Sequence, residues 1–178
     1  MTASNFAASL KLVLESEGGN DDDPQDHGGR TSRGITQREY DAWRREKGLP
    51  ILDVWQAPQE DIDTIYHDEY WEPYCDAMPT GVDYIYFNNA VLDGPHRATI
   101  LLQQAIGVTA DGRIGPVTRQ AVLNANPSAT IIKLSDASYA FYRGLHQPRF
   151  LKGWLNRVSS VEKNALTMTI ASAAGNQA

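Results

Sequence analysis

Apolar residues along most of this chain recur every three to four positions, which is the period of an amphipathic helix. In residues 6–17, Phe6, Leu10, Val13 and Glu17 fall within about 60° of one another if each residue turns the helix by about 100°. The glycine pair that follows ends this helix, because glycine accepts the left-handed conformation common at helix C-termini. The pattern therefore places one carboxyl group, that of Glu17, on the inward face at the end of the first helix.

The same period predicts further helices, separated by Gly and Pro. Thr36 and Glu39 have the spacing of a capping box, which predicts the start of a second helix that runs to about Lys47. The remaining helices are predicted at about 59–70, 82–92, 96–106, 116–125, 127–145 and 154–168. Residues 20–36 are rich in Asp, Gly and Pro and are expected to form an irregular loop or a short hairpin. Strand signals are few, so the predicted fold class is mostly α.

Composition narrows the class of protein. A chain of 178 residues is long enough for one domain, or for a catalytic lobe with a small partner, and its 42% of hydrophobic residues argues against intrinsic disorder. The single cysteine, Cys75, excludes an internal disulfide and a cysteine-based zinc site. No run approaches 18 apolar residues, so membrane insertion is not predicted. The four histidines are scattered, and no metal site or cofactor is expected.

Charge divides the chain into two halves. Residues 1–94 hold 7 Lys and Arg against 19 Asp and Glu, a net charge of −12, whereas residues 95–178 hold 9 against 3, a net charge of +6. The acidic half is a poor surface for nucleic acid, and no nucleic-acid partner is predicted. The basic half either faces an anionic polymer or is a solvated surface, and the sequence leaves both interpretations open.

The first residues of the chain do not have the pattern of a Sec signal peptide. Residues 1–14 lack a cationic start, an apolar core of 7–15 residues and a small-residue cleavage site. We therefore expect synthesis in the cytoplasm and, for a substrate outside it, another export route.

Glu17 is the strongest candidate for chemistry. Glu15 lies on the opposite, polar side of the same helix, so the two carboxyl groups meet different surroundings. Loss of water favours the protonated form of a carboxyl group, and the negative end of the helix dipole acts in the same direction. A protonated carboxyl group is what a general acid needs. The alternative is that the helix frays early and leaves Glu17 in solvent.

A second carboxyl group and a hydroxyl group follow in the loop. Asp26 lies nine residues after Glu17, and Thr31 lies five residues after Asp26. Inverting glycosidases use one protonated carboxyl group and a second, more distant carboxylate that activates a water molecule. A turn-forming role for Asp26 and a structural role for Thr31 remain open.

These residues belong to a longer string with a family resemblance. Glu17-Gly18-Gly19, followed by Asp23-Pro24, Asp26, Gly28-Gly29, Thr31 and Gly34-Ile35-Thr36, resembles the signature of glycoside hydrolase family 108. Members of this family are lysozyme-like N-acetylmuramidases, many of them from phages and prophages. Residues 101–118 resemble the predicted peptidoglycan-binding region that accompanies the family.

The resemblance implies a lysozyme-like fold with a catalytic lobe at 1–94, a helical peptidoglycan-binding-like lobe at 95–170 and a flexible tail at 171–178. It implies cleavage of the β-1,4 bond between N-acetylmuramic acid and N-acetylglucosamine in peptidoglycan glycan strands. Glu17 would be the general acid, and Asp26 with Thr31 would hold the attacking water, with inversion. The protein would act on the cell wall or in the periplasm, as a monomer, after release by a holin or another route.

Four further residues are candidates for contact with the glycan. Tyr70 and Trp71 either stack on sugar rings or belong to the core. Asn88 lies in a helix where the family often has polar residues, and Arg113 lies in an Asp-Gly loop that would present it to the wall.

Two other functions fit the same resemblance. A non-catalytic wall-binding or secretion-associated protein would need none of the three catalytic residues. A lytic transglycosylase would use one glutamate and release a 1,6-anhydro sugar.

Overall fold

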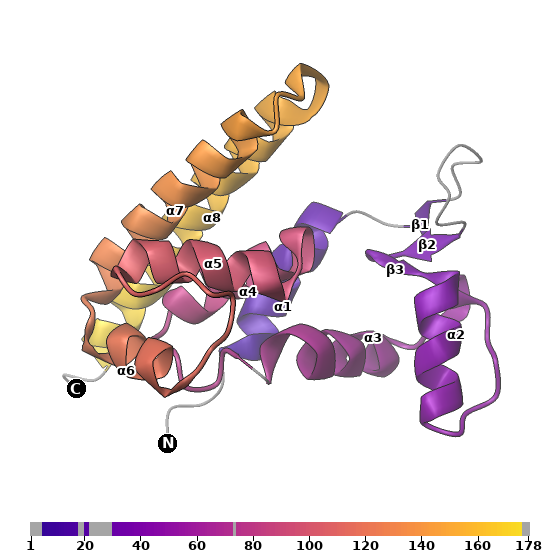
Figure 1. The fold of residues 1–178 in the computed structure, drawn as a ribbon. Helices are drawn as coiled ribbons and strands as arrows, with labels where there is room; N and C mark the ends of the chain where they lie inside the picture. The colour runs from indigo at the N-terminus through magenta and orange to yellow at the C-terminus, as the bar shows by residue number, and fades with distance from the viewer. Residues whose placement is uncertain (1–4, 18–19, 22–29, 73, 176–178) are drawn as a thin grey trace. The chain divides into compact units, whose positions relative to one another are not determined.

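The computed structural model describes residues 5–17, 20–21, 30–72 and 74–175 and is mostly α-helical (Figure 1). The chain forms two compact units. The first spans Phe6–Glu69, and the second spans Tyr70–Ala178 together with the N-terminal residues Met1–Asn5. Within the described residues no helix is long and apolar enough to span a membrane.

The first unit combines three helices with a small sheet. Its elements are α1 (Phe6–Glu17), β1 (Asn20–Asp21), β2 (Thr31–Ser32), β3 (Ile35–Thr36), α2 (Gln37–Glu46), the 3₁₀-helix η1 (Val54–Gln56) and α3 (Gln59–Tyr66). A π-helix, η2 (His67–Trp71), continues directly from α3. The three strands are antiparallel in the order β1-β2-β3. The helix predicted at residues 6–17 is present. Of the two alternatives for residues 20–36, an irregular loop or a short hairpin, β2 and β3 form a hairpin.

A capping box begins α2, as the sequence predicts. The hydroxyl group of Thr36 accepts a hydrogen bond from the Glu39 N–H at 3.3 Å, and the Glu39 carboxylate accepts one from the Thr36 N–H at 2.9 Å. These bonds satisfy two backbone donors that the first turn of a helix leaves unpaired. Because Thr36 also ends β3, the cap joins the sheet to α2 without a loop.

The turn between β2 and β3 contains only Arg33 and Gly34. Ser32 pairs with Ile35, and both turn residues have positive φ angles, 51° and 81°. Two residues with positive φ define a type I′ turn, whose twist matches that of the adjoining strands. Arg33 is held in this conformation by its guanidinium group, which donates to the Ala57 carbonyl at 2.7 Å and to Gln59 at 2.8 Å.

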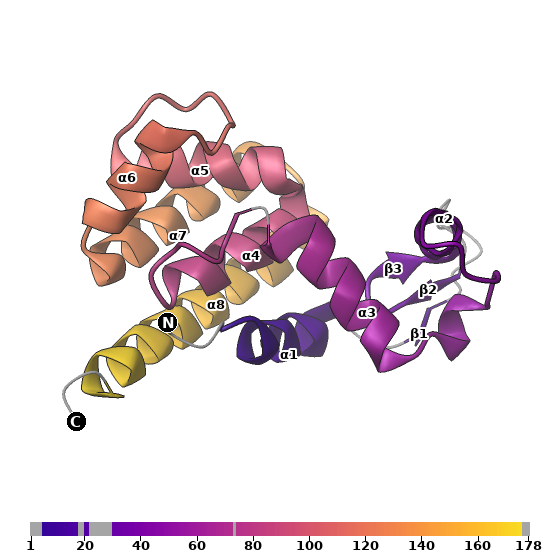
Figure 2. The ribbon, with the colours of Figure 1, turned by 90° about the horizontal axis from the view of Figure 1, so that it is seen from below.

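The second unit is a set of packed helices: α4 (Val82–Asp93), α5 (Pro95–Ile106), α6 (Pro116–Asn124), α7 (Pro127–Gly144) and α8 (Pro148–Gly175). Nine consecutive residues of α4 are buried, and α4 packs against α5, α7 and α8. The long helices α7 and α8 lie side by side in Figures 1 and 2 and contact each other extensively. This unit therefore has its core around α4.

The last helix differs from the sequence prediction. We predicted the last helix at about 154–168 and a flexible tail at 171–178, but α8 begins at Pro148 and continues to Gly175. Proline is favoured in the first turn of a helix, and the alanines near residue 175 have high helix propensity, which explains both extensions. The compact units divide at residues 69–70, because α4 packs with the helices that follow it. The division into a catalytic lobe at 1–94 and a second lobe at 95–170 stays a prediction.

Candidate active site

Glu17 is the last residue of α1, and its side chain is half-buried. Leu10 and Val13, on the same face of α1, are buried, whereas Lys11 and Glu15 on the other side are exposed. The predicted contrast between the two carboxyl groups of this helix is therefore confirmed.

Gly34, in the hairpin turn, lies close to Glu17. A Cβ atom placed on Gly34 would lie 3.4 Å from both Cγ and Oε2 of Glu17, and 2.6 Å from the hydroxyl oxygen of Tyr66. The carboxyl group of Glu17 and the hydroxyl group of Tyr66 therefore lie against the same glycine. No other residue could occupy this position without strain, because the φ angle of 81° also disfavours a side chain.

The hydroxyl group of Tyr66, from the end of α3, donates a hydrogen bond to the Arg33 carbonyl at 2.8 Å. This bond ties the end of α3 to the hairpin turn and fixes the backbone that faces Glu17. Tyr66 is buried, so its hydroxyl group belongs to the inner wall of the site.

Thr31 begins β2 and is half-buried. It pairs with Asp21 of β1 and with Thr36 of β3, so the sheet fixes its backbone from both sides. Its carbonyl oxygen also accepts a hydrogen bond from the indole N–H of Trp55 at 3.2 Å. Thr31 thus lies on the strand that leads into the turn facing Glu17. Asp26 lies outside the described residues.

Sequence reasoning missed three residues around this site: Arg33, Trp55 and Tyr66. Trp55 is 39% exposed, and the guanidinium group of Arg30 lies 4.6 Å from its ring centroid. An exposed tryptophan in a polar connection is a signal that could have been noticed, because such rings often contact ligands. Tyr66 contacts Arg33 of the hairpin, which lies 33 residues away in the sequence. A contact over this separation produces no periodic pattern of residues from which it could be predicted.

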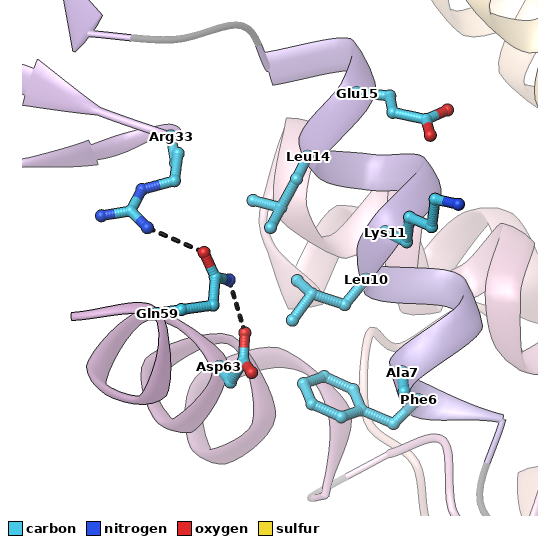
Figure 3. A pocket seen from close by; sticks show the side chains of 9 residues that line it. All are labelled: Phe6, Ala7, Leu10, Lys11, Leu14, Glu15, Arg33, Gln59 and Asp63. Atoms are coloured by element: carbon cyan, nitrogen blue, oxygen red, sulfur yellow. Dashed lines mark hydrogen bonds between the residues drawn. The ribbon is translucent and has the colours of Figure 1, made fainter. Parts of the chain in front are cut away.

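An open pocket of about 610 Å³ lies between α1 and α3, with Arg33 among the residues that line it (Figure 3). Leu10 and Leu14 point into it from α1, opposite a hydrogen-bonded row of Arg33, Gln59 and Asp63. Figure 3 shows Lys11 and Glu15 pointing away from this row. Glu17 is not among the residues that line the pocket, so the pocket is separate from the candidate general acid.

Trp71 and Tyr70, the predicted sugar-stacking pair, lie in the second unit or at its start. Trp71 is 1% exposed, donates its indole N–H to Asp76 at 2.7 Å and packs edge-on against Phe87. A ring this buried presents no face to a sugar, so Trp71 is a core residue and the stacking interpretation is not supported. Tyr70 is half-buried, and its predicted role stays a prediction.

Asn88 and Arg113 have contrasting positions. Asn88 is 4% exposed within α4, and its amide oxygen accepts a hydrogen bond from Arg157 Nε at 3.1 Å. Arg113 is exposed on a loop that buried Gln103 organises, through hydrogen bonds to Asp111 at 2.7 Å and to the Arg113 carbonyl at 3.0 Å. The loop has the geometry needed to present Arg113, whereas Asn88 is too buried for direct contact with a polymer.

Together, the mostly α-helical fold, the small antiparallel sheet and a half-buried glutamate at the end of the first helix define a lysozyme-like protein. The chain matches the family description "Glycosyl hydrolase 108" at residues 10–94 and the description "Predicted Peptidoglycan domain" at residues 97–159. The solved structure of Brucella abortus SagA is similar over 93% of this chain and 95% of its own, with a TM-score of 0.79 and 36% sequence identity. A comparison with curated proteins finds no match.

The chain belongs to the glycosyl hydrolase 108 family. Its two matched regions describe a lysozyme-like glycosidase that degrades peptidoglycan.

Proposed function

We propose that this protein is an N-acetylmuramidase, which hydrolyses the β-1,4 bond between N-acetylmuramic acid and N-acetylglucosamine. The observation that carries the proposal is the position of Glu17, half-buried at the end of α1 with its carboxyl group against the Gly34 turn. A carboxyl group held in this way is suited to proton transfer, because its direction is fixed and its access to water is restricted.

In this mechanism Glu17 donates its proton to the glycosidic oxygen as the bond to the anomeric carbon breaks. A water molecule attacks the same carbon from the opposite face, and its proton passes to Asp26. Thr31 helps to orient this water through its hydroxyl group. The half-buried position of Thr31 on a strand paired at both edges supports this role, since a fixed backbone gives the hydroxyl group a defined direction. The expected outcome is inversion at the anomeric carbon.

The test is the chemistry of the fragments released from purified peptidoglycan. We expect fragments that end in a reducing N-acetylmuramic acid and carry the mass of one added water. Fragments ending in a 1,6-anhydro sugar would identify a lytic transglycosylase, and fragments ending in a reducing N-acetylglucosamine would identify cleavage of the other bond. Tight binding to sacculi with no fragments would indicate a non-catalytic wall-binding protein.

Glu17→Gln is the matched variant for the general acid, and Glu15→Gln, two residues away on the exposed side of α1, is its control. Positioned proton transfer contributes about 10²–10⁴-fold to such reactions. Glu17→Gln should therefore retain less than about 1% of the activity, with an unchanged melting temperature. Glu15→Gln should be close to wild type. Equal effects of the two substitutions would remove Glu17 from the mechanism.

A further inference from the structure

Trp55 is an exposed aromatic residue of the first unit that the mechanism above does not use. It lies in η1, in the connection between α2 and α3, and its side chain is exposed. Leu49 and Ile51 of the same connection are also exposed, and single exposed apolar side chains are normal on a protein surface. Trp55 differs from these two residues in the way in which its side chain is held.

The indole ring of Trp55 is fixed to the small sheet. Its N–H group donates a hydrogen bond to the Thr31 carbonyl oxygen of β2 at 3.2 Å. The guanidinium carbon of Arg30 lies over the ring, 4.6 Å from its centroid, and Arg30 is paired with Asp53. The Asp53 carboxylate also accepts a hydrogen bond from the Trp55 backbone N–H at 2.9 Å. The ring is thus held at its edge, on one face and through its own backbone.

The backbone that carries Trp55 is fixed from two directions. Gln37, the first residue of α2, accepts a hydrogen bond from the Val54 N–H at 2.8 Å and donates one to the Leu52 carbonyl at 2.9 Å. On the other side of η1, the Ala57 carbonyl accepts a hydrogen bond from the hairpin turn at 2.7 Å. A side chain that is already ordered loses little conformational entropy when a ligand binds, so rigid aromatic rings are favoured at binding surfaces.

Trp55 is attached to the hairpin that faces Glu17. Thr31, which accepts the bond from the ring, precedes Gly34 by three residues, and Gly34 lies against the Glu17 carboxyl group. A strand rises about 3.3 Å per residue, so these two points of the hairpin lie within about 10 Å of each other. A glycan strand with its cleaved bond at Glu17 therefore has further sugars within reach of Trp55.

The chemistry of the indole ring is suited to a sugar. An aromatic ring has a flat apolar face with partial negative charge, and one face of a pyranose presents C–H groups with partial positive charge. The indole N–H of Trp55 is already bonded and Arg30 lies over one face, so a ligand binds the ring by stacking on the other face. The ring has no charge of its own, which favours an uncharged sugar ring over a carboxylate of the stem peptide.

We propose that Trp55 binds a sugar ring of the glycan strand outside the two sugars joined by the cleaved bond, and that this contact makes the protein prefer long glycan fragments. The inference rests on the proposed function, because that function supplies the glycan strand. It adds a binding residue for a sugar that does not react.

The experiment measures binding of full-length Glu17→Gln protein to two soluble glycan fragments by NMR titration. The short fragment contains only the sugars on either side of the cleaved bond, and the long fragment extends beyond them in both directions. Trp55→Ala should weaken binding of the long fragment about tenfold, as expected for loss of one aromatic contact, and that of the short fragment by less than about twofold. Ile51→Ala, an exposed apolar control in the same connection, should change neither.

Two further measurements do not depend on the stability of Trp55→Ala. Trp55→Phe keeps an aromatic ring without the indole N–H, and it should retain most of the affinity for the long fragment. The chain has four tryptophans, so the indole N–H signal that is lost in Trp55→Phe belongs to Trp55. In the Glu17→Gln protein this signal should shift when the long fragment is added, and should stay in place with the short one.

Cleavage by the protein with intact Glu17 separates a binding role of Trp55 from a structural one. Trp55→Ala should raise KM for the long fragment about tenfold and leave kcat within about twofold, because a contact with a distant sugar is equally strong in the ground state and the transition state. If Trp55 only held the hairpin against Glu17, the same substitution would lower kcat on both fragments. Melting temperatures show whether each variant is folded.

Equal losses of affinity for the two fragments, or a loss from Ile51→Ala as large as that from Trp55→Ala, would overturn the inference. Normal binding of the long fragment by folded Trp55→Ala, or an indole signal that does not move, would do the same. In these cases a wild-type protein that releases reducing N-acetylmuramic acid ends leaves the proposed function intact. A wild-type protein that releases other ends, while Trp55→Ala still loses affinity for the long fragment alone, refutes the proposed function and supports the inference.

Discussion

Substitution of Gly34 by alanine tests the arrangement of the active site directly. The new methyl group would lie 2.6 Å from the hydroxyl oxygen of Tyr66 and 3.4 Å from Glu17 Oε2. An ordinary contact needs about 3.5 Å, so the turn or Tyr66 must move by nearly 1 Å. A displacement of about 1 Å near a reacting group can reduce the rate about 10²-fold. We therefore expect a loss of activity of that order, measured as release of reducing ends from peptidoglycan.

Backbone strain at a positive φ angle also lowers the stability of Gly34→Ala, separately from the steric clash. Gly48→Ala is the control for this strain. Gly48 also has a positive φ angle, 69°, but nothing lies within 4 Å of its added Cβ atom. Both substitutions should lose about 1–2 kcal/mol of stability from the left-handed conformation alone. Gly34→Ala should lose about 1–3 kcal/mol more from the steric clash, measured by urea unfolding.

Tyr66→Phe removes the oxygen atom with which the methyl group collides. The cost of Gly34→Ala should therefore be smaller in the Tyr66→Phe background than in the wild type, which a double-mutant cycle measures. The reasoning is refuted if Gly34→Ala and Gly48→Ala have the same activity when assayed well below both melting temperatures. It is also refuted if the changes in unfolding free energy caused by Gly34→Ala and Tyr66→Phe simply add in the double variant.

Three other predictions follow from the sequence and the structure. Asp26→Asn should strongly reduce turnover, and NMR of the wild-type reaction should show the α anomer as first product, since a β anomer would mean retention. Burial raises the pKa of the Asp83 carboxyl group from 3.8 to about 6. At pH values between these two pKa values, the native state keeps the proton on Asp83, whereas the unfolded state loses it. Stability should therefore fall by up to about 3 kcal/mol as the pH rises from 4 to above 6, and Asp83→Asn should flatten this dependence in urea unfolding. Binding of Glu17→Gln protein to sacculi should weaken as the Debye length shortens from about 10 Å at 0.1 M salt to about 3 Å at 1 M. It should weaken further when two exposed cations of the second half, Arg113 and, in α6, Arg119, are changed to Glu. Salt-independent binding would contradict the electrostatic role of the second half.

Local signals in the sequence were sufficient for the elements that position Glu17. The apolar period of residues 6–17 and the capping box at Thr36 each depend on residues within one or two turns, and both are found in the structure. An irregular loop or a short hairpin was expected because Asp, Gly and Pro concentrate there, and the sequence did not specify the two-residue turn at Arg33 and Gly34.

Contacts between distant segments could not be predicted in the same way. Tyr66 reaches Arg33 across 33 residues, and Asn88 meets Arg157 across 69 residues. Trp71 illustrates a related limit of sequence prediction. Periodicity predicts which face of a helix carries an aromatic ring, but it does not predict whether another helix or strand covers that face. In α4, which is buried over nine consecutive residues, the period carries little information on which side chain meets solvent.

The joint between the sheet and α2 has a consequence for tolerance to changes in chain length. Thr36 is at once the partner of Thr31 in the sheet and the N-cap of α2. Side chains alternate between the two faces of a strand, so one residue inserted at Arg33-Gly34 would either turn Thr31 to the opposite face or break the cap. The connection after α2, around Gly48, does not combine strand pairing with a helix N-cap. Nothing lies within 4 Å of a Cβ atom added at Gly48. Natural and engineered insertions should therefore accumulate around residues 47–50, whereas the two-residue turn should keep its length.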